Sequence, residues 1–503
     1  MDFFTFDSEV WTKLVGLLQY DSMSPMSLAS GFFLFAFLIF GLGYMAVRNH
    51  RTMRTLYVVI ISAYFYYKIS GLYLLLLFAV AISDYLIGCG IARCIAKGKR
   101  GRGLVALSMI INISILAYFK VGGLFEEAIN SLFGSGTINL GAIVVPAGVS
   151  FFVFQSISYV IDISRGVISP VKRFIDYLFL LSFFPKVFLG PLVRNKEFIP
   201  QIERESIVVT RQDHGRAVVL IASGLIKYAV IAKAIDSILL IPAVSGEFGE
   251  SGVVMLVALY GFGIRLYCDF SGYSDIAIGI ALVMGYKLPD NFDAPFKSAT
   301  ITEFWRRWHI SLSSWLRDYL YISLGGNRKG KVRTYLNLII TMVLGGLWHG
   351  AAVRFVLWGA LHGVALALHK MWLAIVPWAK ANGKDMNPVV RLFGIILTFN
   401  IVCLGWLLFR AEDMQTVHLM LYQIFHSFNT AIIPQVVLGY KEVFALIVIG
   451  YGMHFMPAAI DSDMQRKVAS ASFWWQVALI VMAAWCVMQI KSSGIQPFIY
   501  FQF

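Results

Sequence analysis

Long uncharged apolar runs recur along the chain and predict membrane-spanning helices. A helix needs about 20 apolar residues to cross about 30 Å of hydrocarbon. Runs that approach or reach this length include Ser27 to Val47, Leu392 to Phe409 and Ser472 to Ile490. Nothing between the runs is long and polar enough for a separate soluble domain. The pattern predicts an all-α polytopic membrane protein with roughly 11 to 13 membrane-embedded helices.

Several of these apolar runs contain helix-breaking residues. Pro146 and Gly148 fall inside the run from Ala142 to Ile161, and Pro185 and Gly190 interrupt another run. Broken or re-entrant helices occur at membrane depth only where protein or a water-filled cavity surrounds them. We therefore expect the helices to surround a central tunnel, which either an enzyme or a transporter can use.

No repeat of fixed period, low-complexity tract or linker divides the sequence, so residues 27–503 are expected to form one transmembrane domain. Residues 1–26 mix Phe, Trp, Asp and Glu in a way that suits an N-terminal interfacial segment. They lack the basic flank and cleavage site of a signal peptide, so we expect the segment to be retained.

Composition supports the membrane assignment. The 503 residues are 58% hydrophobic and 14% charged, whereas about a quarter of the residues in soluble domains are charged. The net charge of +14 raises the question of nucleic acid, but the basic residues lie in short loops, where the positive-inside rule expects them. We interpret them as topology signals. The five cysteines show no metal-ligand spacing, so no metal site is predicted.

The densest chemical signal lies in residues 301–333. Aromatic and apolar residues recur there at helical spacing from Phe304 to Leu320, with Arg306 and Arg307 between them, and Thr302 is compatible with a helix start. On periodicity alone the favoured interpretation is an interfacial helix. Its arginines would then lie at the lipid headgroups and its tryptophans in the aromatic belt.

Two histidines change that interpretation. A single histidine such as His309 in an amphipathic helix is more often structural than catalytic, but His349 follows an uncharged stretch and precedes Gly350. An imidazole near membrane depth is costly unless it is paired or lines a polar cavity. A neutral histidine, with an ordinary pKa of about 6.5, can take a proton from a hydroxyl that attacks a thioester or ester carbonyl.

These residues also carry a family resemblance. The sequence FWRRWHISLSSWLRDYLYISLGGNR at 304–328, followed by LGGLWHGA at 344–351, resembles the signature of the membrane-bound O-acyltransferase (MBOAT) superfamily. The similarity is greatest to the branch that contains the membrane subunit of bacterial alginate O-acetyltransferase and the D-alanyl transfer protein of teichoic acid synthesis. Segments 146–166, 183–194 and 267–279 look like parts of that branch in the same order. The resemblance runs from about residue 27 to the end and implies an MBOAT-like acyltransferase domain.

The resemblance implies catalytic roles for both histidines. His349 corresponds to the catalytic histidine, acting as general base, and His309 to the second histidine or its partner in the tunnel. The other predicted tunnel or substrate-binding residues are Trp305, Trp308, Trp348, Arg306, Arg307, Asp269 and Ser271.

Several of these residues have ordinary structural alternatives. Asp269 can form a buried ion pair with Arg265, which we place ahead of a catalytic role. Ser271 equally fits helix packing. Arg306 and Arg307 can attract donor phosphates or simply follow the positive-inside rule.

The aromatic end of the chain, PFIYFQF, also resembles a motif of this branch. The phenol of Tyr500 is a hypothetical acyl relay or a guide for a partner. The alternative is interfacial anchoring of the last span.

The predicted function is transfer of an acyl group, expected to be acetyl, from a cytosolic thioester donor such as acetyl-CoA. The acceptor is a hydroxyl of an extracytoplasmic polysaccharide or a periplasmic acyltransferase partner, across the bacterial cytoplasmic (inner) membrane. Membrane lipid is the other expected partner, with no nucleic acid and no tightly bound cofactor. The alternatives are a transporter or flippase for a glycan or lipid-linked sugar, in which His349 only lines a path, and a non-catalytic scaffold.

Overall fold

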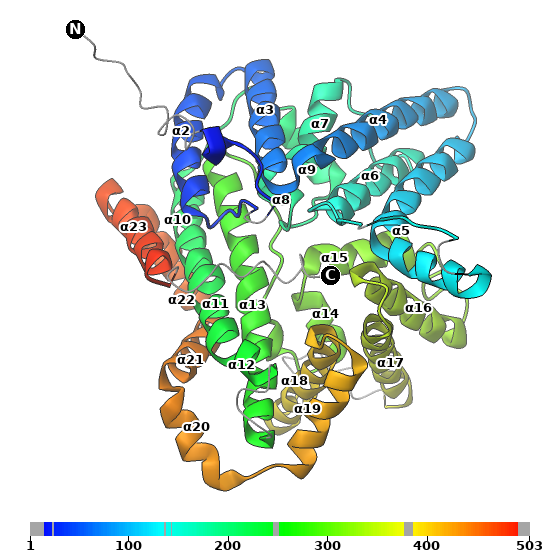
Figure 1. Cartoon of the computed structure of the whole chain (residues 1–503). Helices are drawn as coiled ribbons and strands as arrows, with labels where there is room; N and C mark the ends of the chain where they lie inside the picture. The colour runs from blue at the N-terminus through cyan, green and yellow to red at the C-terminus, as the bar shows by residue number, and fades with distance from the viewer. Residues whose placement is uncertain are drawn as a thin grey trace. The chain divides into compact units, whose positions relative to one another are not determined.

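The computed structural model describes residues 15–22, 25–134, 137–141, 143–244, 251–376 and 386–490. The regular elements in these ranges are helices, with no strand among them (Figure 1). This confirms the all-α prediction. Tyr500 lies outside the described residues.

Six helices in the described part of the chain are long and apolar enough to cross a membrane. They are Arg51–Ala96, Arg102–Phe133, Arg211–Ala243, Gly252–Val283, Val353–Ile375 and Pro388–Arg410. A pair bent by 86° makes a seventh if it is counted as one span, and it consists of Thr430–Gly439 and Lys441–Phe455. Shorter apolar helices cover Gly31–Val47, Val149–Ser164 and Phe473–Gln489. The chain is a multi-pass membrane protein, as predicted.

The chain forms two compact units. The first contains residues 1–119, 142–208 and 284–286. Its helices are α2 (Gly31–Val47), α3 (Arg51–Ser70), η1 (Gly71–Tyr73), α4 (Leu74–Ala96), the first part of α5 (Arg102–Phe133), α6 (Val149–Ser164), α7 (Phe174–Ser182), α8 (Phe184–Val187) and α9 (Asn195–Ile202).

A buried carboxylate ties three helices of the first unit together. Asp84 of α4 is fully buried. It accepts hydrogen bonds from Ser108 Oγ and Asn112 Nδ2 of α5, each at 2.6 Å, and from Ser156 Oγ of α6. Because apolar surroundings offer a carboxylate no other donors, these hydroxyl and amide groups fix the three helices against one another.

The predicted helix breaks are present in this unit. Helix α6 begins at Val149, directly after Gly148, whose φ is 70°. A Cβ at Gly148 would lie 2.3 Å from the carbonyl oxygen of Val187, in the short helix that carries Pro185. The two interrupted segments therefore meet backbone to backbone, which only a residue without a side chain allows.

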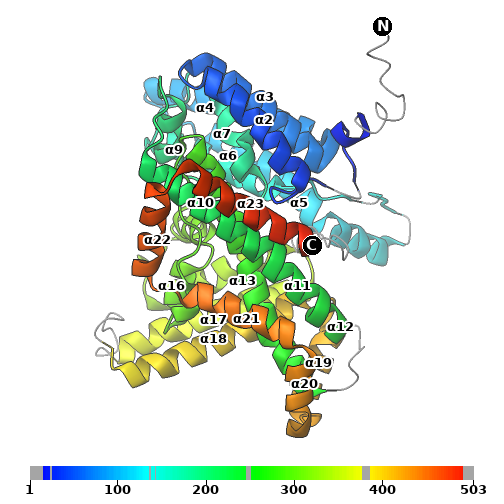
Figure 2. The same cartoon turned by 90° about the vertical axis from the view of Figure 1, so that its left-hand side faces the viewer.

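The second unit contains residues 120–141, 209–283 and 287–503. One long helix runs through α10 (Arg211–Leu225), η2 (Ile226–Ala232), α11 (Lys233–Ile235), η3 (Asp236–Leu240) and α12 (Ile241–Val244). It packs along α13 (Gly252–Val283), and α22 (Ala458–Ser470) and α23 (Phe473–Ile490) lie beside α10 (Figure 2). The remaining helices are η4 (Pro295–Lys297), α14 (Ile301–Arg307), α15 (Ile310–Trp315), η5 (Leu316–Tyr321), α16 (Lys331–His349), α17 (Val353–Ile375), α18 (Pro388–Arg410), α19 (Met414–His426), η7 (Thr430–Ile432), α20 (Ile433–Gly439) and α21 (Lys441–Phe455).

Ion pairs join the long helix to α13. Arg265 of α13 lies 3.0 Å from a carboxylate oxygen of Asp236 and 3.1 Å from one of Asp269, and all three side chains are buried. Lys227 pairs with Asp275 in the same interface. Lys227 and Asp236 belong to η2 and η3, which are π-helical. The predicted ion pair of Asp269 with Arg265 is confirmed.

Helices α16 and α17 form a tightly packed antiparallel hairpin, and they lie side by side in Figure 1. A Cβ added to Gly346 would lie 2.2 Å from the carbonyl oxygen of Phe355, and one added to Gly359 would lie 2.4 Å from that of Met342. Such small residues let helix backbones touch. The contact fixes the turn of the hairpin, and His349 is the last residue of α16 before that turn.

Replacing Gly359 by alanine is expected to lower the free energy of unfolding by about 1–3 kcal/mol, the usual cost of overpacking. Gly452 of α21 is the matched control, because a Cβ there has no neighbour within 4 Å, and alanine is a better helix former than glycine by about 1 kcal/mol. Thermal unfolding of both variants in detergent measures the difference. A Gly359→Ala protein as stable as Gly452→Ala would contradict the backbone contact between α16 and α17.

Candidate active site

The segment around His309 is not the continuous helix that the sequence pattern predicts. Helix α14 ends at Arg307 and α15 begins at Ile310. Between them His309 adopts φ 43° and ψ 54°, in the left-handed region. The start also differs slightly, because the Thr300 side chain accepts a hydrogen bond from the Glu303 N–H and the helix begins at Ile301. A left-handed residue with a side chain is uncommon and persists only when its surroundings hold it in place.

Asn291 holds this turn from outside the helices. Its backbone oxygen accepts a hydrogen bond from the Ile310 N–H at 2.9 Å. Its side-chain Oδ1 lies 3.1 Å from Nδ1 of His309 and accepts bonds from the N–H and the hydroxyl of Ser311, at 3.2 and 2.9 Å. The His309 ring also meets the Phe270 ring edge to face, with centroids 4.6 Å apart. The break is therefore fixed by contacts on both the backbone and the imidazole.

Aromatic rings enclose His349 at the turn of the α16–α17 hairpin. Its ring centroid lies 4.5 Å from that of Trp348, 5.2 Å from Trp358 and 4.9 Å from Phe409. Trp358, Phe409 and Phe355 form a buried cluster against which Trp305 packs. His349 is itself buried.

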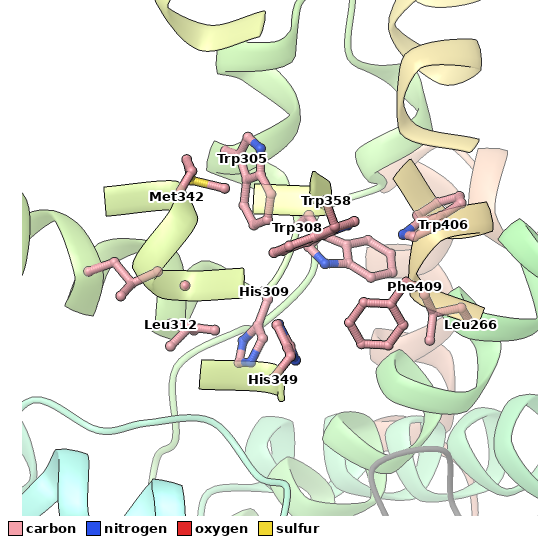
Figure 3. A pocket seen from close by; sticks show the side chains of 12 residues that line it. Leu266, Trp305, Trp308, His309, Leu312, Met342, His349, Trp358, Trp406 and Phe409 are labelled. Atoms are coloured by element: carbon pink, nitrogen blue, oxygen red, sulfur yellow. The ribbon is translucent and has the colours of Figure 1, made fainter. Parts of the chain in front are cut away.

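Both histidines line one pocket, a cavity of about 30 Å³, which is large enough for water. Figure 3 shows the two imidazoles next to each other, with Trp305 and Met342 at the opposite end of the pocket. The other wall residues are Leu266, Trp308, Leu312, Leu316, Gly345, Trp358, Trp406 and Phe409. Among the described wall residues, the imidazoles are the only titratable side chains.

The pocket keeps both imidazoles neutral. Neither α14, α15 nor α16 is among the candidate spans. Burial lowers the pKa of His309 to about 3. Burial, and after it the charge of Lys120 and the neighbouring imidazole of His309, hold the pKa of His349 well below its ordinary value. Both rings are therefore neutral near pH 7, and a neutral imidazole can act as a base.

The structure brings together four of the predicted site residues: His309, His349, Trp305 and Trp308. The others lie outside the pocket wall. Trp348 packs on the His349 ring, and Ser271 is buried in α13 with Asp269. Arg306 is exposed, and Arg307 pairs with Glu303 at 3.1 Å and Asp293 at 3.0 Å.

Other histidines have identifiable surroundings. Nε2 of His454 accepts a hydrogen bond from the Phe296 N–H at 3.1 Å, so this predicted buried residue has a partner on one of its two ring nitrogens. His362 packs against the rings of Trp305 and Trp358, and His369 bonds to the hydroxyl of Thr302 at 2.8 Å. In the part of the chain that the structure describes, no three His, Cys, Asp or Glu side chains come together as metal ligands.

Sequence reasoning missed Asn291 and most of the aromatic wall. Trp358, Trp406 and Phe409 lie in α17 and α18, where an aromatic residue is hard to distinguish from ordinary apolar packing. Trp358 follows His349 by nine positions, and this nearness is the signal that could have pointed to it. Asn291 lies in a loop and its sequence context carries no comparable signal.

The pocket lies in a part of the chain that is similar to known proteins. The model of the membrane-bound O-acyltransferase family matches residues 164–404, which include both histidines. A Pseudomonas putida protein described as a probable alginate O-acetylase is 32% identical over 505 residues, 95% of this chain and all of that protein. The chain belongs to the membrane-bound O-acyltransferase family. The expected resemblance is thus confirmed, and the protein is a membrane O-acyltransferase.

Relatives of this O-acyltransferase carry names that refer to different polymers. A peptidoglycan O-acetyltransferase of Helicobacter pylori is 32% identical, covering 76% of this chain and 77% of its own length. A teichoic acid D-alanyltransferase of Streptococcus thermophilus is also 32% identical, over 52% of this chain and 67% of its own length. The shared element of these names is acyl transfer.

Narrowing the pocket of the acyltransferase is expected to slow acyl transfer without unfolding it. The nearest atom to a Cβ at Gly345 is Leu316 Cδ1 at 3.5 Å, an ordinary contact, so Gly345→Val adds its methyl groups to the pocket wall. One or two extra methyl groups in such a pocket change rates by about tenfold or more. Gly452→Val is the control for valine in a helix. Transfer of a labelled acyl group in membrane vesicles measures the rate, and an unchanged rate in Gly345→Val would show that the reactants do not use this pocket.

Proposed function

We propose that this acyltransferase moves an acyl group, acetyl, from a cytosolic thioester donor across the bacterial inner membrane. The acceptor is a hydroxyl of an extracytoplasmic polysaccharide or of a partner protein that relays the group. The observation that carries the proposal is the pair of imidazoles, His309 and His349, side by side in one apolar pocket. The names of the relatives, which refer to alginate, peptidoglycan and teichoic acid, support an envelope polymer as the final acceptor.

His349 is the proposed general base. Its neutral ring accepts the proton of the acceptor hydroxyl while the hydroxyl oxygen bonds to the thioester carbonyl carbon. The carbon–sulfur bond then breaks, and the imidazolium returns the proton to the leaving thiolate. No net charge remains in the pocket after the transfer, which suits walls made of tryptophan, leucine and phenylalanine.

The charges of the α16–α17 hairpin support access from two sides. The end of the hairpin away from His349 carries three basic residues, Lys331 and Arg333 at the start of α16 and Lys370 near the end of α17, whereas the end beside His349 carries Arg354. Helix α17 is a candidate span, so by the positive-inside rule its end near Lys370 faces the cytoplasm. His349, at the turn, then lies toward the opposite side, from which an extracytoplasmic hydroxyl arrives.

Family membership favours this enzyme over the transporter and the scaffold. No tightly bound cofactor is part of the proposal, because the acyl donor is consumed as a substrate. Arg306 is exposed and Arg307 is partly exposed, so both can contact phosphates of a cytosolic donor. The relay through Tyr500 stays a prediction, since that residue lies outside the described part of the chain.

Replacing His349 by glutamine is expected to reduce acyl transfer by about 10²- to 10⁴-fold, the scale of general-base catalysis. The matched control is His454→Gln, another buried histidine of the same unit, whose bond from the Phe296 N–H a glutamine oxygen can also accept. Labelled acetyl-CoA is supplied to vesicles that contain each variant, together with a periplasmic partner if one is needed.

The two variants separate catalysis from folding. Loss of labelling in His349→Gln, with His454→Gln near wild type and both proteins folded, supports the proposal. Equal labelling in both variants would overturn it. Movement of glycan across the vesicles without any acyl labelling in the wild type would instead favour transport.

A further inference from the structure

The orientation of the Asn291 side chain is fixed by its surroundings. A backbone N–H can only donate, so the atom that faces the Ser311 N–H at 3.2 Å must be the carbonyl oxygen, Oδ1. The amide nitrogen then faces the other way and donates to Ser274 Oγ at 3.2 Å. Turning the amide over would bring its N–H groups against the Ser311 N–H. Asn291 is 1% exposed, so water cannot replace the lost bonds.

This orientation decides where His309 carries its proton. Nδ1 of His309 lies 3.1 Å from Asn291 Oδ1, which is an acceptor. Two lone pairs facing each other would repel, so Nδ1 must be the protonated nitrogen. A neutral imidazole carries one N–H, and the other nitrogen, Nε2, then holds the lone pair.

We propose that Asn291 is a positioning residue that fixes His309 in the pocket wall as the Nδ1–H tautomer, with the lone pair on Nε2. The same residue acts twice, because its backbone oxygen accepts the Ile310 N–H and so holds the left-handed turn that presents the ring. Phe270, edge to face with the ring at 4.6 Å, limits its rotation. Burial lowers the pKa of His309, so the ring is neutral and carries a single N–H, on either Nδ1 or Nε2.

The consequence for the reaction rests on the proposed function. With Nδ1 occupied by Asn291, His309 can only accept a proton or a hydrogen bond through Nε2. Asn291 itself is not among the wall residues of the pocket, so its effect reaches the reaction through His309. The tautomer, by contrast, does not depend on what the pocket catalyses.

Solid-state NMR of protein with ¹⁵N,¹³C-labelled histidine in lipid bilayers reads the tautomer directly. The His309 signals are assigned by their loss in His309→Gln. We expect an Nδ1–H signature in the wild type, its retention in Asn291→Asp at about pH 8, above the range in which most histidines titrate, and a shift to Nε2–H or to a mixture in Asn291→Leu. Asn337→Leu is the matched control, because Asn337 is a fully buried asparagine of α16 whose amide donates to backbone oxygens elsewhere. The control should leave the His309 signals unchanged.

Kinetics gives a second readout. Asn291→Leu should lower kcat about ten- to hundredfold, the scale of losing a partner that orients a histidine, with KM for the donor little changed. Asn291→Asp keeps the acceptor oxygen and should recover most of the lost kcat when assayed at about pH 8, above the range in which most histidines titrate. A merely structural role would lower activity equally in both variants.

Three results would overturn the inference: an Nε2–H signature for His309 in the wild type, an unchanged signature in Asn291→Leu, or an equal loss of kcat in the leucine and aspartate variants. If Asn291→Leu does not fold, the wild-type spectrum still decides. Failure of the proposed function looks different, because His349→Gln would then keep full acyl labelling while His309 still shows the Nδ1–H signature.

Discussion

Polar groups that lie among apolar side chains must find their hydrogen-bond partners within the chain, because neither lipid nor a packed core supplies them. Asp84 meets this requirement through donors on neighbouring helices, and Arg265 meets it between Asp236 and Asp269. At the pocket one amide oxygen, on Asn291, serves both the turn and the ring of His309. The break at His309 and the placement of these charges in the helices follow from these pairings.

Two unrelated local features of the backbone position the two imidazoles in the pocket. His349 is placed by glycines that let α16 and α17 touch backbone to backbone, so its position is set by the absence of side chains. His309 is placed by a left-handed turn whose cost, of order 1–3 kcal/mol, is offset by the hydrogen bonds that Asn291 accepts from the His309 ring and from the Ile310 N–H. Neither feature alone defines the pocket, because each positions only one of the two imidazole rings.

Local chemistry made part of this structure predictable. Pro146 and Gly148 restrict or free their own backbone, so the break before α6 could be predicted from the sequence. Arg265 and Asp269 are one helical turn apart, so their ion pair could be predicted as well. The helix break at His309 could not be predicted, because the sequence pattern around it is helical. The residue that holds the break, Asn291, lies 18 positions earlier in the chain. The aromatic wall was missed for a related reason, since lipid-facing and pocket-facing tryptophans look alike in an apolar helix.

An amide suits this pocket better than a carboxylate as the group that orients a histidine. A carboxylate beside His309 would favour the imidazolium, and that charge would in turn oppose protonation of the neighbouring His349. Asp269, the carboxylate among the predicted site residues, is paired with Arg265, as favoured from the sequence, and lies outside the pocket wall. Asn291 orients its ring without adding charge, so both imidazoles stay neutral in apolar surroundings. His349 can then take up a proton during the transfer without meeting a fixed positive charge on His309.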